Sequence, residues 1–305
     1  MVKASKNNPD QPCDLLILGG DADPNILRLV LRANELGVNM RAVLVGKSGT
    51  PRVTVDVLNN ALIVEGKTIR PKAVFIRPNV FEYLETKEYA AHTRAEAWFS
   101  MFIGWILANP DVRFLNRRYY HRNGVNKLET LLMARQLGFM VTETYFTNDA
   151  KLLTEKAAEN AWIEKPVEGG AHTQMLQPRD PKVFNQNVTS APTTIQRVLI
   201  QPEIRVFRIG QDLAAFKVAS DKLDYREASN TTLEHVGVPA GFEGPFMQLT
   251  ERLGLDYAAA DFKTDEKSGD LALLEVNSGA MFAGFDRVSD GALTAAMIKY
   301  LVKSG

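Results

Sequence analysis

A change of hydrophobic period near the start of the chain constrains the fold more than any other feature. Residues 13–47 read CDLLILGGDADPNILRLVLRANELGVNMRAVLVGK. The apolar run from Leu15 to Leu18 predicts a buried strand that ends at a Gly-Gly turn, and apolar residues then recur at helical spacing until Gly37. The order strand, helix, strand predicts an α/β domain. The fingerprint G-x-G-x-x-G is absent, so the turn does not favour a nicotinamide dinucleotide.

The rest of the chain divides into further parts. We expect a disordered tail over residues 1–13, an N-terminal α/β domain over 14–120, a second unit over 121–198 and a third over 199–305. Cys13 then lies in the tail. The polar stretch TSAPTT at residues 189–194 is the segment most typical of a mobile connection.

Two helices stand out in this division. The first is predicted from about residue 86 to 108, where a helix-breaking Asn-Pro pair ends it, and its three aromatic residues Trp98, Phe102 and Trp105 favour the core or a dimer contact over a ligand site. The second spans residues 123–138, with Asn123 or Asn126 as its N-cap. Its inward-facing residues are predicted to be Leu128, Leu131, Leu132 and Leu137.

Composition excludes several classes of function. Lys plus Arg and Asp plus Glu number 36 each, so no global field attracts nucleic acid or an anionic membrane. The N-terminus lacks the apolar region of a secretory signal, which places the protein in the cytoplasm. A single cysteine excludes an internal disulfide, and the four histidines show no zinc-ligand spacing.

Polar oxygens gather on one predicted hairpin. The segment YAAADFKTDEKSGDLALLEVN (257–277) predicts two strands about a polar turn, and antiparallel pairing brings Asp261 near Glu275. Asn277 lies two residues after Glu275 and therefore on the same face. Such a set suits Mg²⁺, and Glu275 could bridge two ions. Equally, Glu275 and Asn277 could cap the following turn while Asp261 lies at the surface.

Cationic residues precede this hairpin in the chain. Lys127 stands in the first turn of a predicted helix, where a cation is mildly unfavourable unless an anion lies nearby, although a lone lysine is usually a solvated surface residue. Lys165 ends an apolar strand just before the loop PVEGGAHT, which is a phosphate-binding arrangement in general terms. Arg205 and Arg226 complete the cationic set, whereas Arg208, Arg117 and Arg118 read as surface charges.

Taken in order, these residues resemble the ATP-grasp superfamily over almost the whole chain. The motifs NKLETLLMARQLGFMVTETYFTND, IEKPVEGG, LDYRE and LGLDYAAADF…LLEVNSG are similar to those of ribosomal-protein glutamate ligases and of microviridin-type (graspetide) macrocyclising ligases. The resemblance implies an α/β (α+β) ATP-grasp fold. Residues 14–120 would form the pre-ATP-grasp domain, 121–198 the central lobe with a phosphate lid, and 199–305 the C-terminal lobe with a magnesium site.

The resemblance also implies a role for individual residues. Lys127 and Lys165 would contact the α- and β-phosphates of ATP, with Glu168, Gly169 and Gly170 in the lid. The backbone of Leu199, Ile200 and Gln201 would meet adenine, and Glu203 would hold the ribose or precede the arginine. Asp261, Glu275 and Asn277 would carry two Mg²⁺ ions. Arg226 would stabilise the transferring phosphate, and Arg205 would face the acyl phosphate or substrate carboxylate.

The implied reaction is amide formation by an ATP-dependent carboxylate–amine ligase through an acyl phosphate. Its substrate would be an amino acid or peptide of a biosynthetic pathway; a graspetide-type macrocyclase and an ATP-grasp kinase are the alternatives. The sequence identifies no base for the amine, and Asp224, Glu227 or substrate phosphate could serve. We expect a homodimer or higher homo-oligomer. Candidate substrate contacts are Arg205, Ser278, Gly279, Met281 and Arg287, with Phe282 and Phe285 as an apolar wall and Asp286 as an alternative polar contact. The alternative for the aromatic residues is the core, which we favour for Phe285.

Overall fold

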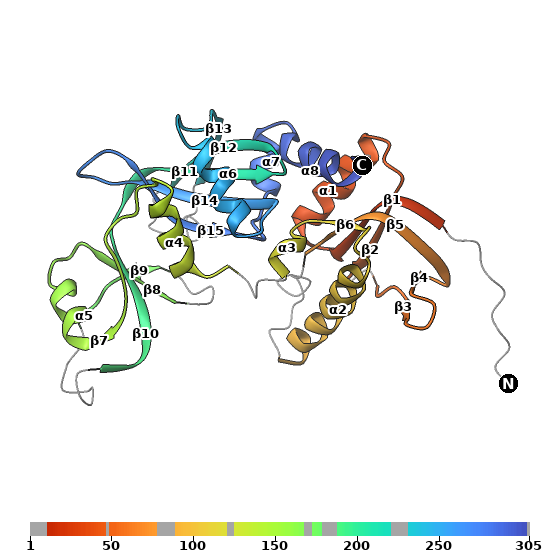
Figure 1. The fold of residues 1–305 in the computed structure, drawn as a ribbon, viewed down its shortest axis with the longest axis horizontal. Helices are drawn as coiled ribbons and strands as arrows, with labels where there is room; N and C mark the ends of the chain where they lie inside the picture. Colours follow the sequence, from red (N-terminus) through yellow and green to blue (C-terminus); the bar gives the residue numbers. More distant parts are fainter. Residues whose placement is uncertain are drawn as a thin grey trace. The chain divides into compact units, whose positions relative to one another are not determined.

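The computed structural model describes residues 11–46, 49–77, 89–120, 125–167, 173–178, 188–220 and 231–303. The chain divides into two compact units. One unit contains the residues up to Arg118 together with those from Met281 onward, and the other runs from Tyr119 to Ala280. Figure 1 traces the helices and strands of both along the sequence.

The first unit is built on a mixed sheet. Its central strand β1 pairs in parallel with β2 and β5, and β6 adds to β5 in parallel, whereas β3 and β4 are antiparallel. This is the α/β arrangement that the opening segment predicts. The strands are β1 (Gln11–Gly20), β2 (Met40–Val45), β3 (Val53–Asp56), β4 (Ala61–Val64), β5 (Lys67–Ile76) and β6 (Arg113–Phe114).

Helix α1 (Pro24–Glu35) connects β1 to β2. The side chain of Asp23 caps it by accepting the N–H of Asn25, and proline occupies the first helical position, where its missing N–H costs nothing. Ile26 and Leu29 are buried toward the sheet. The buried Asp23 also accepts a hydrogen bond of 2.8 Å from Arg77 Nε at the end of β5.

The predicted disordered tail is wrong for its last residues, because β1 already begins at Gln11. Residues 11–13 pair in register with Ile69 to Pro71 of β5, and Cys13 is only 1% exposed. Burial raises the pKa of the Cys13 thiol to about 11. Cys13 is therefore an unreactive core thiol at neutral pH.

The long apolar helix is α2 (Tyr89–Ala108), and the first residues of the predicted span, 86–88, lie outside the described residues. Phe102 and Trp105 are buried, and Trp98 stacks on Phe102 with ring centroids 5.8 Å apart. The core interpretation is confirmed for Phe102 and Trp105, whereas Trp98 is only half-buried. A short helix, α3 (Arg117–Tyr120), follows, and Arg117 donates to the carbonyl oxygens of Ile106, Asn109 and Val112, so it is not a simple surface charge.

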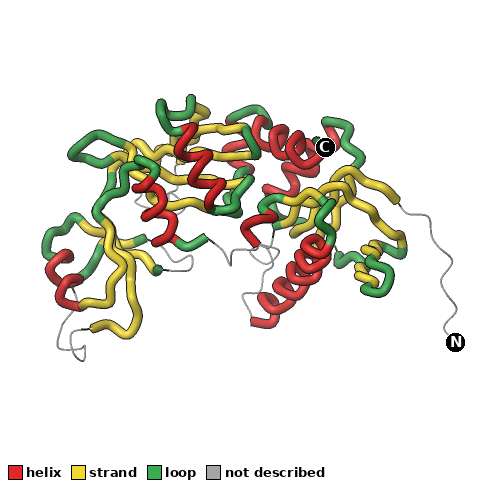
Figure 2. Tube along the Cα trace, viewed as in Figure 1, coloured by secondary structure: helices red, strands yellow, loops and turns green. Residues whose placement is uncertain are grey.

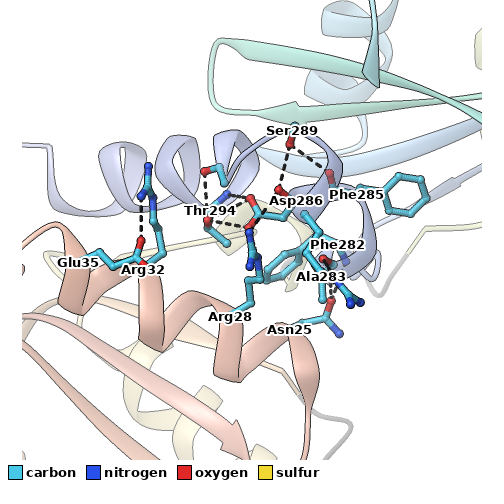
Figure 3. Close-up of polar contacts among 12 residues, drawn as sticks. Asn25, Arg28, Arg32, Glu35, Phe282, Ala283, Phe285, Asp286, Ser289 and Thr294 are labelled. Atoms are coloured by element: carbon cyan, nitrogen blue, oxygen red, sulfur yellow. Dashed lines mark hydrogen bonds and ion pairs between the residues drawn. The ribbon is translucent and has the colours of Figure 1, made fainter. Parts of the chain in front are cut away.

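The C-terminal helices α7 (Ala283–Val288) and α8 (Ala292–Val302) pack against α1. Figure 3 shows Asn25 and Arg28 of α1 pointing toward α7. Asn25 Oδ1 accepts the backbone N–H groups of Phe282 at 2.7 Å and Ala283 at 2.8 Å, and thereby caps α7 from another helix. The predicted third unit ends at 305, but these contacts group residues from Met281 onward with the first unit.

Asp286 fixes the same three helices together. Its fully buried carboxylate accepts from Arg28 Nε at 2.5 Å, and from the backbone N–H and hydroxyl of Thr294 at 2.8 and 3.0 Å (Figure 3). Phe282 and Phe285 are also buried. The prediction that Phe282 and Asp286 line a substrate pocket is therefore wrong, because the helix packing of the first unit buries both, whereas the expected core position of Phe285 is confirmed.

The second unit contains an antiparallel sheet of order β7-β10-β8-β9. One face packs against α5 (Ala150–Ala157) through Leu153, Trp162 and Ile195. TSAPTT is wrong as a mobile connection, because it lies within β10, where a bulge interrupts the pairing with β7. The strands are β7 (Thr144–Asp149), β8 (Trp162–Pro166), β9 (Gln174–Met175) and β10 (Val188–Arg197).

The other sheet of this unit has the order β13-β12-β11-β14-β15 and is antiparallel throughout. Figure 2 distinguishes the strands, in yellow, from the helices, in red. One face carries the apolar side chains that pack with α4 and α6. The opposite face carries the polar residues of the candidate site. The elements are α4 (Lys127–Gln136), β11 (Ile200–Ile209), β12 (Asp212–Ser220), β13 (Thr231–Val236), α6 (Glu243–Arg252), β14 (Tyr257–Thr264) and β15 (Leu271–Asn277).

Helix α4 begins where the sequence predicts but exposes part of its apolar surface. Asn126 is the N-cap and accepts the N–H of Glu129 at 3.1 Å, which settles the choice between the two asparagines. Leu131 is buried in the core beside the sheet, but Leu128 and Leu132 are 43% and 56% exposed. The prediction that these two leucines face inward is wrong, because only one narrow stripe of this short helix meets the sheet.

The Asp286 contacts make a measurable contribution to stability. Replacing Asp286 with alanine should lower the free energy of unfolding by about 3 kcal/mol, because Arg28 and the Thr294 N–H lose a buried acceptor. Urea denaturation measures this loss. The matched control is Glu35→Ala, which removes an exposed ion pair with Arg32 and should cost less than about 1 kcal/mol. Equal losses in both variants would contradict a locking role for Asp286.

Candidate nucleotide and metal site

The pairing of β14 with β15 places Asp261 directly opposite Glu275, as the sequence predicts. Phe262 pairs with Leu273, so Leu274 is an extra residue that forms a β-bulge. The bulge changes which face the following side chains occupy. Leu273 and Val276 both lie in the apolar core although they are three residues apart, and Glu275 faces the other way. Without the extra residue, Glu275 would share the core face with Leu273.

Asn277 connects the two carboxylates. Its side-chain Nδ2 donates to Asp261 Oδ2 at 3.2 Å and to Glu275 Oε1 at 3.0 Å. Asp261 is 5% exposed, and Glu275 and Asn277 are half-buried. The amide hydrogens thus lie between two carboxylates that would otherwise repel each other. The proposed alternative, in which Asp261 is a surface residue, is excluded by its burial.

Arg205 of β11 lies opposite Asp261 and forms a two-point ion pair with it. Arg205 Nε donates to Oδ1 at 2.5 Å, and Nη2 donates to Oδ2 at 2.7 Å, with both side chains buried. Such a fork fixes the orientation of the carboxylate. The contact assigns Arg205 a direct role in holding Asp261; its contact with a substrate carboxylate or acyl phosphate stays a prediction.

Glu203 lies two residues before Arg205 on the same face of β11 and is almost fully buried. Its carboxylate pairs with Lys263 Nζ at 3.2 Å, directly across from it on β14. Burial raises the pKa of Glu203, and the charge of Asp261 adds to this, while Lys263 and Arg205 oppose it. The sequence reasoning missed Lys263, although its spacing of two from Asp261 on a predicted strand marks it for the same face.

Lys165 of β8 lies within the electrostatic reach of these carboxylates. Its Nζ donates to Gln196 Oε1 of β10 at 3.0 Å. Burial lowers the pKa of Lys165, and among the nearby charges Glu275 and Asp261 raise it while Lys127 and Lys263 lower it. The charges that act on this ammonium thus come from the other sheet of the unit and from α4. Lys127, the first residue of α4, is one of these charges and is half-buried rather than fully solvated; its contact with ATP phosphates stays a prediction.

The remaining predicted residues fall into three groups. Leu199 is buried just before β11, whereas Ile200 and Gln201 are exposed at its start, and Gln201 Oε1 accepts the N–H of Glu203 at 2.9 Å. Ser278 and Gly279 follow β15 in the second unit, whereas Met281 and Arg287 are exposed in the first. The structure does not describe Glu168, Gly169, Gly170, Asp224, Arg226 and Glu227.

Among the described residues, no group of three or more histidine, cysteine, aspartate or glutamate side chains could hold a metal. The oxygen donors of the cluster are two carboxylates and one carboxamide. Among the helices that the structure describes, none combines the length and hydropathy that a membrane crossing requires.

Solved structures resemble this chain over nearly its full length. The ATP-grasp ligase PsnB, complexed with a minimal precursor, is 22% identical, with 94% of this chain and 99% of PsnB covered and a TM-score of 0.71. Macrocyclase MdnC from Microcystis aeruginosa, bound with precursor peptide MdnA, is 17% identical, with coverage of 95% and 100% and a TM-score of 0.69. No family model and no curated protein matches the chain.

A third solved structure with a similar fold is a D-Ala:D-Ser ligase. The VanG D-Ala:D-Ser ligase from Enterococcus faecalis is 11% identical, with 96% of this chain and 99% of VanG covered and a TM-score of 0.58. The chain therefore has the fold of ATP-grasp ligases, and the predicted fold is confirmed.

A substitution at Arg205 tests whether its ion pair with Asp261 stabilises the fold. Arg205→Met should lower the free energy of unfolding by about 3–5 kcal/mol, because it leaves the Asp261 carboxylate buried without its partner. Chemical denaturation provides the value. Arg52→Met, which removes a largely exposed pair with Glu65, should cost about 0–1 kcal/mol. If Arg205→Met proved as stable as Arg52→Met, the ion pair would not support the fold.

Proposed function

We propose that this chain is an ATP-dependent carboxylate–amine ligase of the ATP-grasp type. One observation carries the proposal: Asp261 and Glu275 lie opposite each other on β14 and β15 and share the amide of Asn277. The ammonium of Lys165, on the other sheet of the unit, lies within the electrostatic reach of both carboxylates. A lysine near an oxygen-rich cluster is suited to hold a phosphate chain and its counterion together. The fold shared with PsnB and VanG supports the same function.

The cluster fits Mg²⁺ in its chemistry. Two carboxylates and a carboxamide are hard oxygen donors, and Mg²⁺ is usually held by one or two carboxylates with water and phosphate oxygens completing its shell. Asp261, Glu275 and Asn277 would hold it; Asn277 would turn its amide so that Oδ1 replaces Nδ2 as the inward atom. Two ions would be accommodated if Glu275 bridged them. When bound, Mg²⁺ would neutralise charge on the phosphates.

The side chains of this chain would then position two substrates. Lys165 and Lys127 would bind phosphate oxygens of ATP, with Arg226 and the segment Glu168 to Gly170 closing over them. A substrate carboxylate would attack the γ-phosphorus, forming an acyl phosphate and releasing ADP. An amine would attack the acyl carbon and expel phosphate, and the nitrogen would lose one proton, for which the departing phosphate, Asp224 or Glu227 could be the acceptor. Excluding water matters because a wet acyl phosphate hydrolyses.

A peptide is the substrate class that the comparisons favour. PsnB and MdnC are both described with a precursor or precursor peptide, and each is covered almost completely by this chain. MdnC is a macrocyclase, so ring closure within one peptide is the second candidate reaction. A free amino acid as substrate, a homo-oligomeric state and a cytoplasmic location stay predictions.

ADP release with Mg-ATP and pooled short peptides and amino acids tests the proposal. A ligase should yield ADP together with a product whose mass equals acid plus amine minus one water; a macrocyclase should yield the peptide minus one water. Lys165→Ala should reduce turnover by about 100-fold, because the ammonium no longer stabilises the transferring phosphate. Lys151→Ala, at a largely exposed lysine on α5, is the matched control and should leave turnover unchanged.

Two outcomes would contradict the proposal. A product that carries a stable phosphate and no new amide or ester would identify a kinase on the same fold. Equal turnover in Lys165→Ala and the wild-type protein would show that the assigned site does not bind the reacting phosphates.

A further inference from the structure

Gln196 is fully buried in β10 and contacts the ammonium group that the proposed reaction needs. In the pairing of β10 with β8, Gln196 lies opposite Ile163 and Thr194 lies opposite Lys165. Gln196 and Lys165 therefore project from the same face of the sheet. The side-chain oxygen of Gln196 accepts the hydrogen bond of 3.0 Å from Lys165 Nζ.

A relay of hydrogen bonds fixes which end of the Gln196 amide faces the lysine. Gln196 Nε2 donates to Thr144 Oγ1 of β7 at 3.0 Å, and Thr144 Oγ1 donates to the carbonyl oxygen of Thr142 at 2.9 Å. Because a hydroxyl has only one hydrogen to donate, Thr144 can only accept from Gln196. The amide nitrogen must then face Thr144, and its oxygen faces Lys165.

This contact meets two needs of Lys165. Its four-carbon stem is flexible, so a fixed acceptor reduces the freedom lost when a ligand binds. Its ammonium is desolvated between charges of both signs, and an accepted hydrogen bond favours the charged form. An ammonium carries three donors, so two remain for other acceptors while Gln196 holds the first.

We propose that Gln196 is a positioning residue that holds the Lys165 ammonium in the orientation required for nucleotide phosphates. The inference rests on the proposed function, and it adds a residue that no motif of the sequence indicated. Thr144 supports this role indirectly, because its hydroxyl oxygen accepts the hydrogen bond from Gln196 Nε2.

Calorimetric titration of the full-length protein with Mg-ADP and with adenosine tests this role. Gln196→Leu removes the acceptor at nearly constant volume and should raise the Kd for ADP about tenfold, the scale of one hydrogen bond to a charged group. The Kd for adenosine, which has no phosphate, should not change. Thr193→Val removes another hydrogen bond near Lys165, to its backbone oxygen at 3.2 Å, and should leave both values unchanged.

A double-mutant cycle distinguishes positioning from general packing. In a Lys165→Met background, Gln196→Leu should cause no further loss of ADP binding. Thr144→Val, which removes only the far end of the relay, should weaken ADP binding in the same direction by a smaller factor. It serves as the test if urea denaturation shows that Gln196→Leu does not fold.

The possible failures are distinguishable. If the wild-type protein binds ADP and both Gln196→Leu and Thr144→Val bind it equally well, the positioning role is overturned and the proposed function stands. If the loss persists in the Lys165→Met background, Gln196 acts through packing and the inference is overturned. If the wild-type protein binds no ADP at all, the proposed function itself is contradicted, and the inference with it.

Discussion

The β-bulge at Leu274 is the constraint on which the candidate site depends. A strand whose side chains alternate strictly would bury Leu273 and Glu275 on the same face, and a carboxylate cannot enter an apolar core without a large penalty. The extra residue lets Leu273 and Val276 both pack in the core while Glu275 and Asn277 face the polar side. The extra residue thus allows apolar packing on one face of the strand and places the oxygen-bearing side chains on the other.

Residues of neighbouring strands pair with the charged side chains on this polar face of the sheet. Asp261 is held by the fork of Arg205, Glu203 is neutralised by Lys263, and Asn277 donates to both carboxylates of the cluster. Buried charges persist only when they are paired in this way. The second sheet contributes Lys165, which Gln196 and Thr144 hold through a directional relay. The candidate site therefore combines charged residues of two sheets rather than a single motif.

Much of this arrangement followed from the sequence, and the failures have physical causes. Local pattern predicted the hairpin that pairs Asp261 with Glu275, a helix cap at Asn123 or Asn126 and the strand that carries Lys165, because each depends on residues close in the chain. Pairing between distant segments did not follow: the burial of Cys13 against β5 and the ion pair of Arg205 both come from strand neighbours that no local pattern identifies. Gln196 gave no signal, since its partners lie on two other strands. The bulge could not be predicted either, because Leu274 is one apolar residue in an apolar run.

The dependence of ADP binding on Mg²⁺ tests the central claim most directly. If Asp261, Glu275 and Asn277 hold the cation between the protein and the phosphates, ADP should bind at least tenfold more tightly with Mg²⁺ than with a chelator, about 1.4 kcal/mol of coupling. The same coupling should disappear in Glu275→Gln, which removes one charge while keeping the shape of the side chain. Equal ADP affinity with and without Mg²⁺, or an undiminished magnesium effect in Glu275→Gln, would contradict the assignment of this face as the nucleotide and metal site.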